Sequence, residues 1–131
     1  RDLRMSRGLG DVYKRQILFN KKQLSKAKQY ALKSISLDGS NGKPYILIAN
    51  MYASSPNWSD ENALNKCTYF AVIDKLQRAK SVDSSVEEEA NKLIGTYSRY
   101  TPKDEDLFFL GLKKGDSVTI GGWIGETTTI R

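Results

Sequence analysis

The sequence contains no histidine and only one cysteine, Cys67. A zinc site is built from several cysteine or histidine ligands, and the common serine and cysteine nucleophiles require an imidazole base. A disulfide within the chain is excluded as well, because it would need a second cysteine. We therefore expect no catalytic residue, no metal site and no cofactor, and we interpret Cys67 as a small residue packed between helices.

Long hydrophobic runs are also missing. The longest candidates, residues 45–49 and 107–110, are far shorter than the roughly 20 residues that cross a bilayer. Hydrophobic residues make up 39% of the 131 residues and charged residues 27%, a balance typical of a folded globular domain. We therefore expect one domain with a hydrophobic core and no membrane span.

The formal net charge of +6 is unevenly distributed. Residues 1–16 hold five basic and two acidic residues, so half of the excess lies there, and the signs are interspersed in the rest. One basic cluster, formed by lysines 21, 22, 26, 28 and 33, falls on a predicted helix. A solvated helix face explains this cluster better than a nucleic-acid site, which would also need stacking aromatic residues. We expect no nucleic-acid partner.

The first sixteen residues differ from the rest of the chain. They show no helical or strand period, and Gly8 and Gly10 would break either element. The string GDVYKRQ resembles an adapter-derived prefix that recurs in reading frames from metagenomic assemblies. We interpret residues 1–16 as an artefact of this kind, or as disordered, fused to a truncated gene product. A natural basic arm is the alternative.

Hydrophobic periodicity predicts consecutive helices after this segment. Residues 23–37 place Leu24, Ala27, Ala31, Ser34 and Ile35 on one face. Further helices are predicted from Pro44 onward, over residues 60–80 and over residues 85–100, with residues 54–59 as a loop. Proline suits a first helical position because its missing N–H needs no partner there. Short connections make these helices antiparallel neighbours.

The spacing of large and small residues in these helices resembles the tetratricopeptide repeat. Its first-helix positions correspond to Tyr45, Ile48, Ala49 and Tyr52, and again to Ala90, Leu93, Ile94 and Tyr97. Its second-helix positions correspond to Val72, Leu76 and Ala79. The resemblance covers about residues 17–99 and implies an α-solenoid fragment of antiparallel helical hairpins that binds a protein or peptide.

The chain departs from this family pattern in three places. Tyr45 and Ala90 are 45 residues apart, whereas the family period is about 34 residues, and the excess falls around residues 54–65. Gly39 and Ser84 stand where the turn proline is usual, and Ile94 replaces a small residue. An ordinary helical bundle without a groove is the alternative.

Residues 101–131 change in character and form the predicted carboxy-terminal cap. Thr101 as N-cap and Pro102 at the first position predict a short helix over residues 103–110 that ends at Gly111. Residues 115–131 predict a β-hairpin that turns at residues 125–126 or 121–122 and packs on the helices through Trp123.

This cap resembles the carboxy-terminal segment of repeat proteins from Bacteroidetes bacteria. Asp116-Ser117-Val118 resembles an O-glycosylation signal of their envelope, which favours an envelope location over the cytoplasm. An assembly element of that envelope, pairing with other chains through the hairpin edge, is the second functional hypothesis. The oligomeric state stays open.

The repeat resemblance also implies which residues contact a ligand. The concave face is formed by the first helix of each repeat, and the ligand-binding positions in this chain are Lys43, Ile46, Asn50, Ala53, Asn91, Gly95 and Ser98. Lys43 would hold a carboxylate or extended backbone, and Asn50 and Asn91 would do likewise. The acidic clusters at residues 87–89 and 104–106 are interpreted as residues that favour the first turns of helices.

Overall fold

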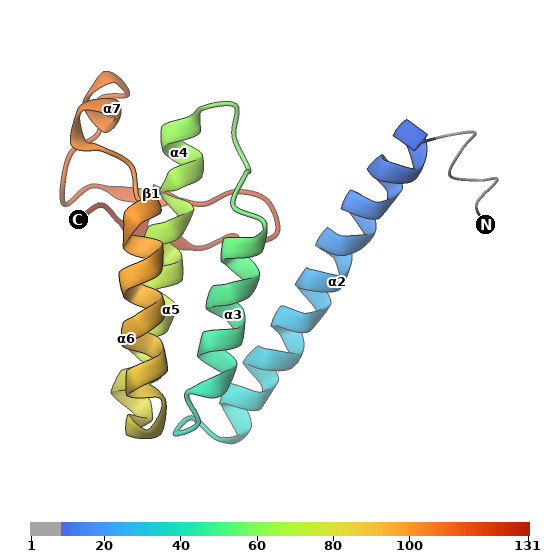
Figure 1. The fold of residues 1–131 in the computed structure, drawn as a ribbon, viewed down its shortest axis with the longest axis vertical. Coiled ribbons are helices and arrows are strands. Elements are labelled where there is room, and N and C mark those ends of the chain that lie inside the picture. The colour runs from blue at the N-terminus through green and yellow to red at the C-terminus, as the bar shows by residue number, and fades with distance from the viewer. Residues whose placement is uncertain (1–8) are drawn as a thin grey trace.

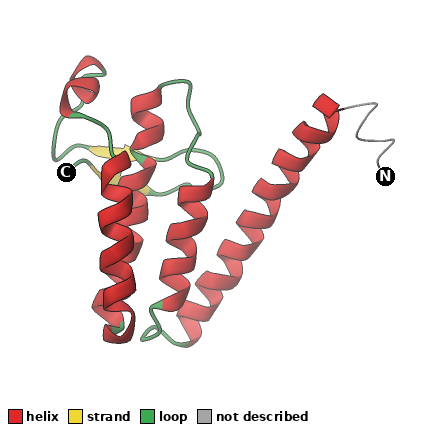
Figure 2. Ribbon diagram, in the orientation of Figure 1, coloured by secondary structure: helices red, strands yellow, loops and turns green. Residues whose placement is uncertain are grey.

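The computed structural model describes the backbone of residues 9–131 and the side chains from residue 23 onward. It is mainly helical, with a small two-stranded antiparallel sheet near the C-terminus (Figure 2). The helices are α2 (Leu9–Leu37), α3 (Lys43–Ser54), α4 (Asn62–Lys66), α5 (Thr68–Val82), α6 (Glu87–Tyr97) and α7 (Asp104–Phe109). Two short 3-10 helices, η1 (Ser84–Val86) and η2 (Ser98–Tyr100), flank α6, and the strands are β1 (Ser117–Thr119) and β2 (Thr127–Thr129).

Helix α2 begins earlier than the sequence pattern predicted. It includes residues 9–16, so the expectation that Gly10 prevents a helix there is wrong. A glycine inside a helix costs only about 1 kcal/mol relative to alanine, which the remaining turns of a long helix can offset. The predicted disorder of residues 1–8 lies outside the described residues, and the artefact hypothesis stays a prediction.

The core lies around α5, which packs against both α3 and α6 and runs antiparallel to both of them (Figure 1). The residues that matched the repeat pattern fill it: Ile48, Ala49, Tyr52, Val72, Leu76, Ala79 and Ala90 are fully buried. Leu93, Ile94 and Tyr97 pack against this core in part. The prediction of antiparallel helices with these buried faces is confirmed. Helix α2 meets α3 near their connecting turn and diverges from it toward its own N-terminus (Figure 1).

The helix predicted over residues 60–80 is divided in two at Cys67. The Cys67 N–H bonds back to the carbonyls of Ala63 and Leu64 and closes α4, and α5 begins at the next residue. Side chains at this junction hold the preceding loop, because the Asn65 Oδ1 accepts the N–H groups of Trp58 and Ser59. Cys67 is fully buried there, as the packing interpretation predicted.

Two turns at the same end of the helices are joined through Asp83. Its Oδ2 accepts the Gly42 N–H at 2.9 Å, and its Oδ1 accepts the N–H and hydroxyl of Ser85 at 3.0 and 2.6 Å. These bonds favour the carboxylate, and they hold the pKa of Asp83 below its ordinary value of 3.8, with the Gly42 N–H as the largest cause. Asp83 thus links the α2–α3 turn to the start of η1.

The stability that Asp83 provides should depend on pH. Because the pKa of Asp83 is lower in the folded protein, its contribution is present above pH 3.8 and is lost as the pH falls through the folded-state value. Asp83→Ala should lower the melting temperature at pH 7, and the difference from wild type should shrink below pH 3.8. Thermal unfolding from pH 7 to pH 2 measures it. Asp60→Ala, at an exposed carboxylate, is the control, and an equal effect there would contradict the assignment.

The cap begins differently from its prediction. Helix α7 starts at Asp104, with Lys103 rather than Thr101 as its N-cap residue. The Thr101 hydroxyl instead donates to the Ser98 carbonyl at 2.9 Å, so it closes η2. Gly111 ends the short helix with a φ of 75°, as predicted, since glycine tolerates that conformation.

The hairpin is confirmed, but neither predicted two-residue turn forms it. Val118 pairs with Thr128 at the centre of the ladder, and residues 120–126 make a wider connection closed by the Ile120 N–H and the Glu126 carbonyl at 2.7 Å. The wide connection forms because it turns inward: Ile120 and Ile124 are buried. Burial of these side chains outweighs the local preference for a tight turn.

Polar groups fasten this connection to three helices. The Tyr52 hydroxyl of α3 donates to Glu126, whose carboxylate is also 2.8 Å from the Lys75 ammonium of α5. Lys28 of α2 donates to the Ile124 carbonyl at 2.6 Å. Trp123 meets the Tyr52 ring edge to face, with centroids 5.4 Å apart. The predicted contact of Trp123 with the helices is confirmed.

Candidate functional site

The predicted ligand-binding residues of α3 fall into two groups. Lys43 and Asn50 are exposed, as a binding role requires, and Leu47 lies between them with 51% of its side chain exposed. Ile46 is only 5% exposed, and its assignment to the binding face is therefore wrong. Its position on the helix turns it into the core beside the residues that pack against α5. Ala53 is half-buried at the edge of this face.

The predicted residues of α6 and η2 are all exposed, but they do not form one continuous set with those of α3. Asn50 contacts α6, because its Oδ1 accepts the Tyr97 hydroxyl at 2.9 Å. Asn91 instead accepts the Lys80 ammonium at 2.8 Å and so lies beside α5. Gly95 and Ser98 are exposed on the same helical segment. Asn50 and Asn91 therefore make separate contacts: Asn50 bonds to Tyr97 of α6, whereas Asn91 bonds to Lys80 of α5.

An apolar groove borders Lys43 on the side of α2. It has a volume of about 540 Å³ and is lined by Ala27, Tyr30, Ala31, Ser34, Asn41, Lys43, Pro44 and Leu47. Tyr30 is 76% exposed at its rim. Lys43, Leu47 and Asn50 form the exposed stripe of α3. This stripe therefore presents one cation and one amide next to the apolar groove.

Among residues 23–131, no group of three or more histidine, cysteine, aspartate or glutamate side chains is placed to hold a metal ion. Burial raises the pKa of the Cys67 thiol to about 11, so this residue is a thiol rather than a thiolate at neutral pH. The Glu126 carboxylate contacts the Tyr52 hydroxyl and the Lys75 ammonium, and these contacts join the cap to the helices.

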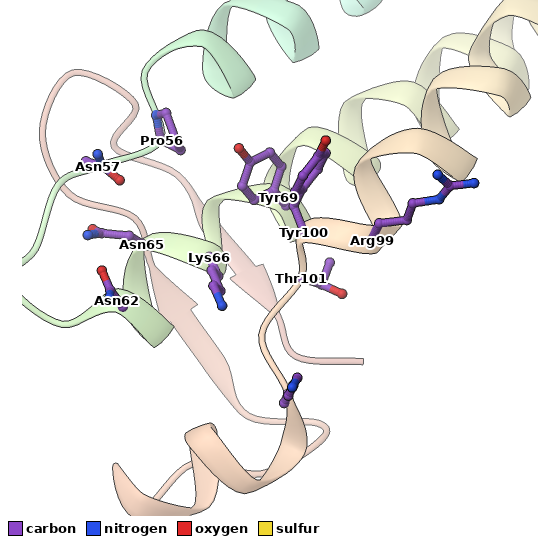
Figure 3. Close-up of a pocket in the computed structure, with 10 residues that line it drawn as sticks. Pro56, Asn57, Asn62, Asn65, Lys66, Tyr69, Arg99, Tyr100 and Thr101 are labelled. Atoms are coloured by element: carbon purple, nitrogen blue, oxygen red, sulfur yellow. The ribbon is translucent and has the colours of Figure 1, made fainter.

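A polar pocket, drawn in Figure 3, lies beside α4 and η2, at the opposite end of α5 from the Asp83 turns. It has a volume of about 370 Å³ and is lined by Pro56, Asn57, Asn62, Asn65, Lys66, Tyr69, Arg99, Tyr100, Thr101 and Lys103. These residues come from the loop before α4, from α4, from the first turn of α5, from η2, and from the segment between η2 and α7. In Figure 3, the Lys66 side chain extends away from the Tyr69 and Tyr100 rings, and Arg99 extends away from the other labelled side chains.

The pocket is cationic, with no acidic residue in its lining. Lys66, Arg99 and Lys103 are exposed, and none of them forms an ion pair within the part of the chain that the structure describes. The neighbouring carboxylate of Asp104 is directed to Lys114, 3.7 Å away. The positive charges of the pocket are thus left without an internal partner.

Tyr69 and Tyr100 line the pocket on the side of α5 and η2, and Tyr97 stacks against Tyr69. The ring centroid of Tyr69 lies 5.3 Å from that of Tyr100 and 6.1 Å from that of Tyr97. Partial burial raises the pKa of Tyr69 and of Tyr97, so both hydroxyls are neutral at physiological pH. Tyr100 is 52% exposed and offers a ring to a ligand.

Sequence reasoning did not find this pocket, since its residues come from segments far apart in the chain. The one local signal was the run from Arg99 to Lys103, in which two cations flank an aromatic residue and a proline. Such a run is common on protein surfaces and gave no reason to select it.

The described part of the chain holds no helix that combines the length and the apolar character of a membrane span. Comparison of the sequence with protein-family models and with curated proteins, and of the fold with solved structures, gives no match.

Proposed function

We propose that this chain is a non-catalytic scaffold of the tetratricopeptide-repeat type that binds a protein or peptide segment. The support is the match between the family pattern and the buried faces of α3, α5 and α6. In that family, the first helices of successive repeats line one face. Here α3 and α6 hold the first-helix positions, with α5 between them in the sequence.

The observation that carries the proposal is the hydrogen bond from Tyr97 to Asn50, at 2.9 Å. It is a side-chain link between α3 and α6, the two helices to which the proposal assigns the first-helix positions. The Asn50 oxygen is occupied by this bond, but its amide N–H groups make no hydrogen bond to the described residues and can donate to a carbonyl of an extended peptide. Lys43 lies on the same exposed stripe and supplies a charge for an acidic side chain.

A peptide array tests this function directly. The full chain is applied to an array of twelve-residue peptides, and the affinity of the peptides it retains is measured by fluorescence anisotropy. Lys43→Ala together with Asn50→Ala should weaken binding by about tenfold, since both residues are exposed contacts of moderate strength. Lys33→Ala with Gln77→Ala, at exposed positions away from this stripe, is the matched control and should leave affinity unchanged. Absence of any retained peptide, or equal affinity for the double variant, would contradict the proposal.

The alternative of assembly through the hairpin edge has weaker support. Each strand is only three residues long, which offers few backbone groups to another chain. The hairpin is also held to α5 through the Thr128 hydroxyl, which donates to Asp74 at 2.6 Å. We therefore favour the peptide-binding scaffold.

A further inference from the structure

We propose that the pocket between α4 and η2 is a second binding site that takes the carboxylate-bearing part of an acidic peptide. The inference rests on the proposed peptide-binding function and adds the chemical class of the partner. The pocket is separate from the exposed stripe of α3, since none of its lining residues belongs to that helix. Its cations, amides and tyrosine rings line one concave space of about 370 Å³.

The charge of the pocket selects an anion. Lys66, Arg99 and Lys103 all line it, and Figure 3 shows the first two. Their ammonium and guanidinium groups have no carboxylate partner among the described residues. A ligand carboxylate can therefore bind them without breaking an existing ion pair. Two cations that line one concave space hold a carboxylate better than an isolated exposed lysine does, because the nearby protein excludes part of the solvent.

The amides favour a peptide over a bare anion. Asn57 and Asn62 line the pocket, and their side chains make no hydrogen bond to the described part of the protein. Each amide presents one acceptor and two donors, which matches the carbonyl and N–H of a peptide unit. The exposed ring of Tyr100 provides an apolar surface for the aliphatic part of a glutamate side chain.

The rim of the pocket is already ordered, which favours binding. The Asn65 amide accepts two backbone N–H groups from the loop and donates to the Ser59 carbonyl at 2.8 Å. The Thr68 hydroxyl donates to the Pro56 carbonyl at 2.8 Å. A loop held in this way does not have to be ordered by the ligand, so less conformational entropy is lost on binding.

The test uses N-acetylated tetraglutamate as the probe and the full chain labelled with ¹⁵N. Titration should shift the amide resonances of Lys66, Tyr69 and Tyr100, and the affinity should fall as salt is raised, because exposed charges are screened. Lys66→Gln with Lys103→Gln should weaken binding by roughly tenfold, at the upper end of what two exposed ion pairs contribute. Lys26→Gln with Lys33→Gln removes the same charge from α2 and should have no effect.

Two reference titrations decide what the pocket recognises. Tetraglutamine has the same backbone without the carboxylates, and inorganic phosphate is an anion without the backbone. Tetraglutamate should bind more tightly than both. Equal binding of tetraglutamine would overturn the role of charge, equal binding of phosphate would show a site for any anion, and resonance shifts outside the pocket would place the peptide elsewhere.

This test is separable from that of the proposed function. If tetraglutamate fails while array peptides bind through Lys43 and Asn50, the pocket inference alone is wrong. If no array peptide depends on Lys43 and Asn50 while tetraglutamate binds in the pocket, the proposed binding face is wrong and the pocket remains.

Discussion

Replacing Tyr52 with alanine is expected to lower the free energy of unfolding by about 3–5 kcal/mol, the usual cost of truncating a large buried aromatic residue. Tyr52 is fully buried and has the greatest volume among the side chains that are. Its ring contacts Trp123 edge to face, and the Lys28 ammonium lies 5.2 Å from the ring centroid. Removing the ring therefore leaves a cavity at the point where α2, α3 and the cap meet.

The variant Tyr52→Phe distinguishes the contribution of the ring to stability from that of the hydroxyl. It keeps the ring but removes the hydrogen bond to Glu126, which should cost about 1 kcal/mol. Tyr30→Ala is the control for the loss of a tyrosine in itself, because this side chain is 76% exposed and should change stability by less than about 0.5 kcal/mol. Urea unfolding followed by circular dichroism measures all three variants. A small effect of Tyr52→Ala would show that the cap is not joined to the core as described.

Gly42→Ala is expected to destabilise the protein by about 1–3 kcal/mol, the range for overpacking a filled site. A Cβ atom at Gly42 would lie 2.6 Å from a methyl carbon of Val86 and 2.7 Å from the carbonyl oxygen of Ala79. The carbonyl belongs to the backbone of α5 and cannot move without disturbing the helix. The Gly42 N–H donates to the Asp83 carboxylate at 2.9 Å, and the added methyl group would also push these two groups apart.

Gly39→Ala, in the same turn, is the matched control for Gly42→Ala. The nearest atom to a Cβ at Gly39 is the Ile35 carbonyl oxygen at 3.7 Å, an ordinary contact distance. This variant should be neutral or slightly stabilising, because alanine restricts the unfolded chain more than glycine does. Similar melting temperatures for the two variants would contradict the close approach of the turns at Gly42.

Both predictions concern contacts between segments far apart in the chain. Tyr52 and Glu126 lie in α3 and after β1, and Gly42 and Asp83 lie in two different turns. Because the cap shares its core with the helices, we expect residues 23–131 to unfold as one cooperative unit. A separate early transition of the hairpin would show otherwise.

The sequence by itself determined the helices and their inward faces. Periodicity placed Ile48, Leu76 and Ala90 in the core because a helix that buries one face must repeat its apolar residues every three or four positions. Local chemistry was informative where only near neighbours decide the conformation. Pro44 lies in the first turn of α3 and Gly111 ends α7 for this reason.

Predictions made from neighbouring residues were wrong where contacts with distant segments decided the conformation. Thr101 had the form of an N-cap residue but bonds to η2, and residues 120–126 gave up a tight turn to bury Ile120 and Ile124. Ile46 was assigned to the ligand face by analogy with a repeat pattern, and the angle of its side chain around α3 placed it in the core instead.

The polar pocket and the docking of the cap were decided by the tertiary structure alone. Lys66 and Lys103 acquire a shared role only when the junction of α4 and α5 meets the end of η2, and Glu126 meets Tyr52 only after the hairpin has packed. A sequence pattern records what neighbours within a few residues require of each other. It does not record which surfaces of two distant segments will meet, because that depends on how all the buried faces fit together.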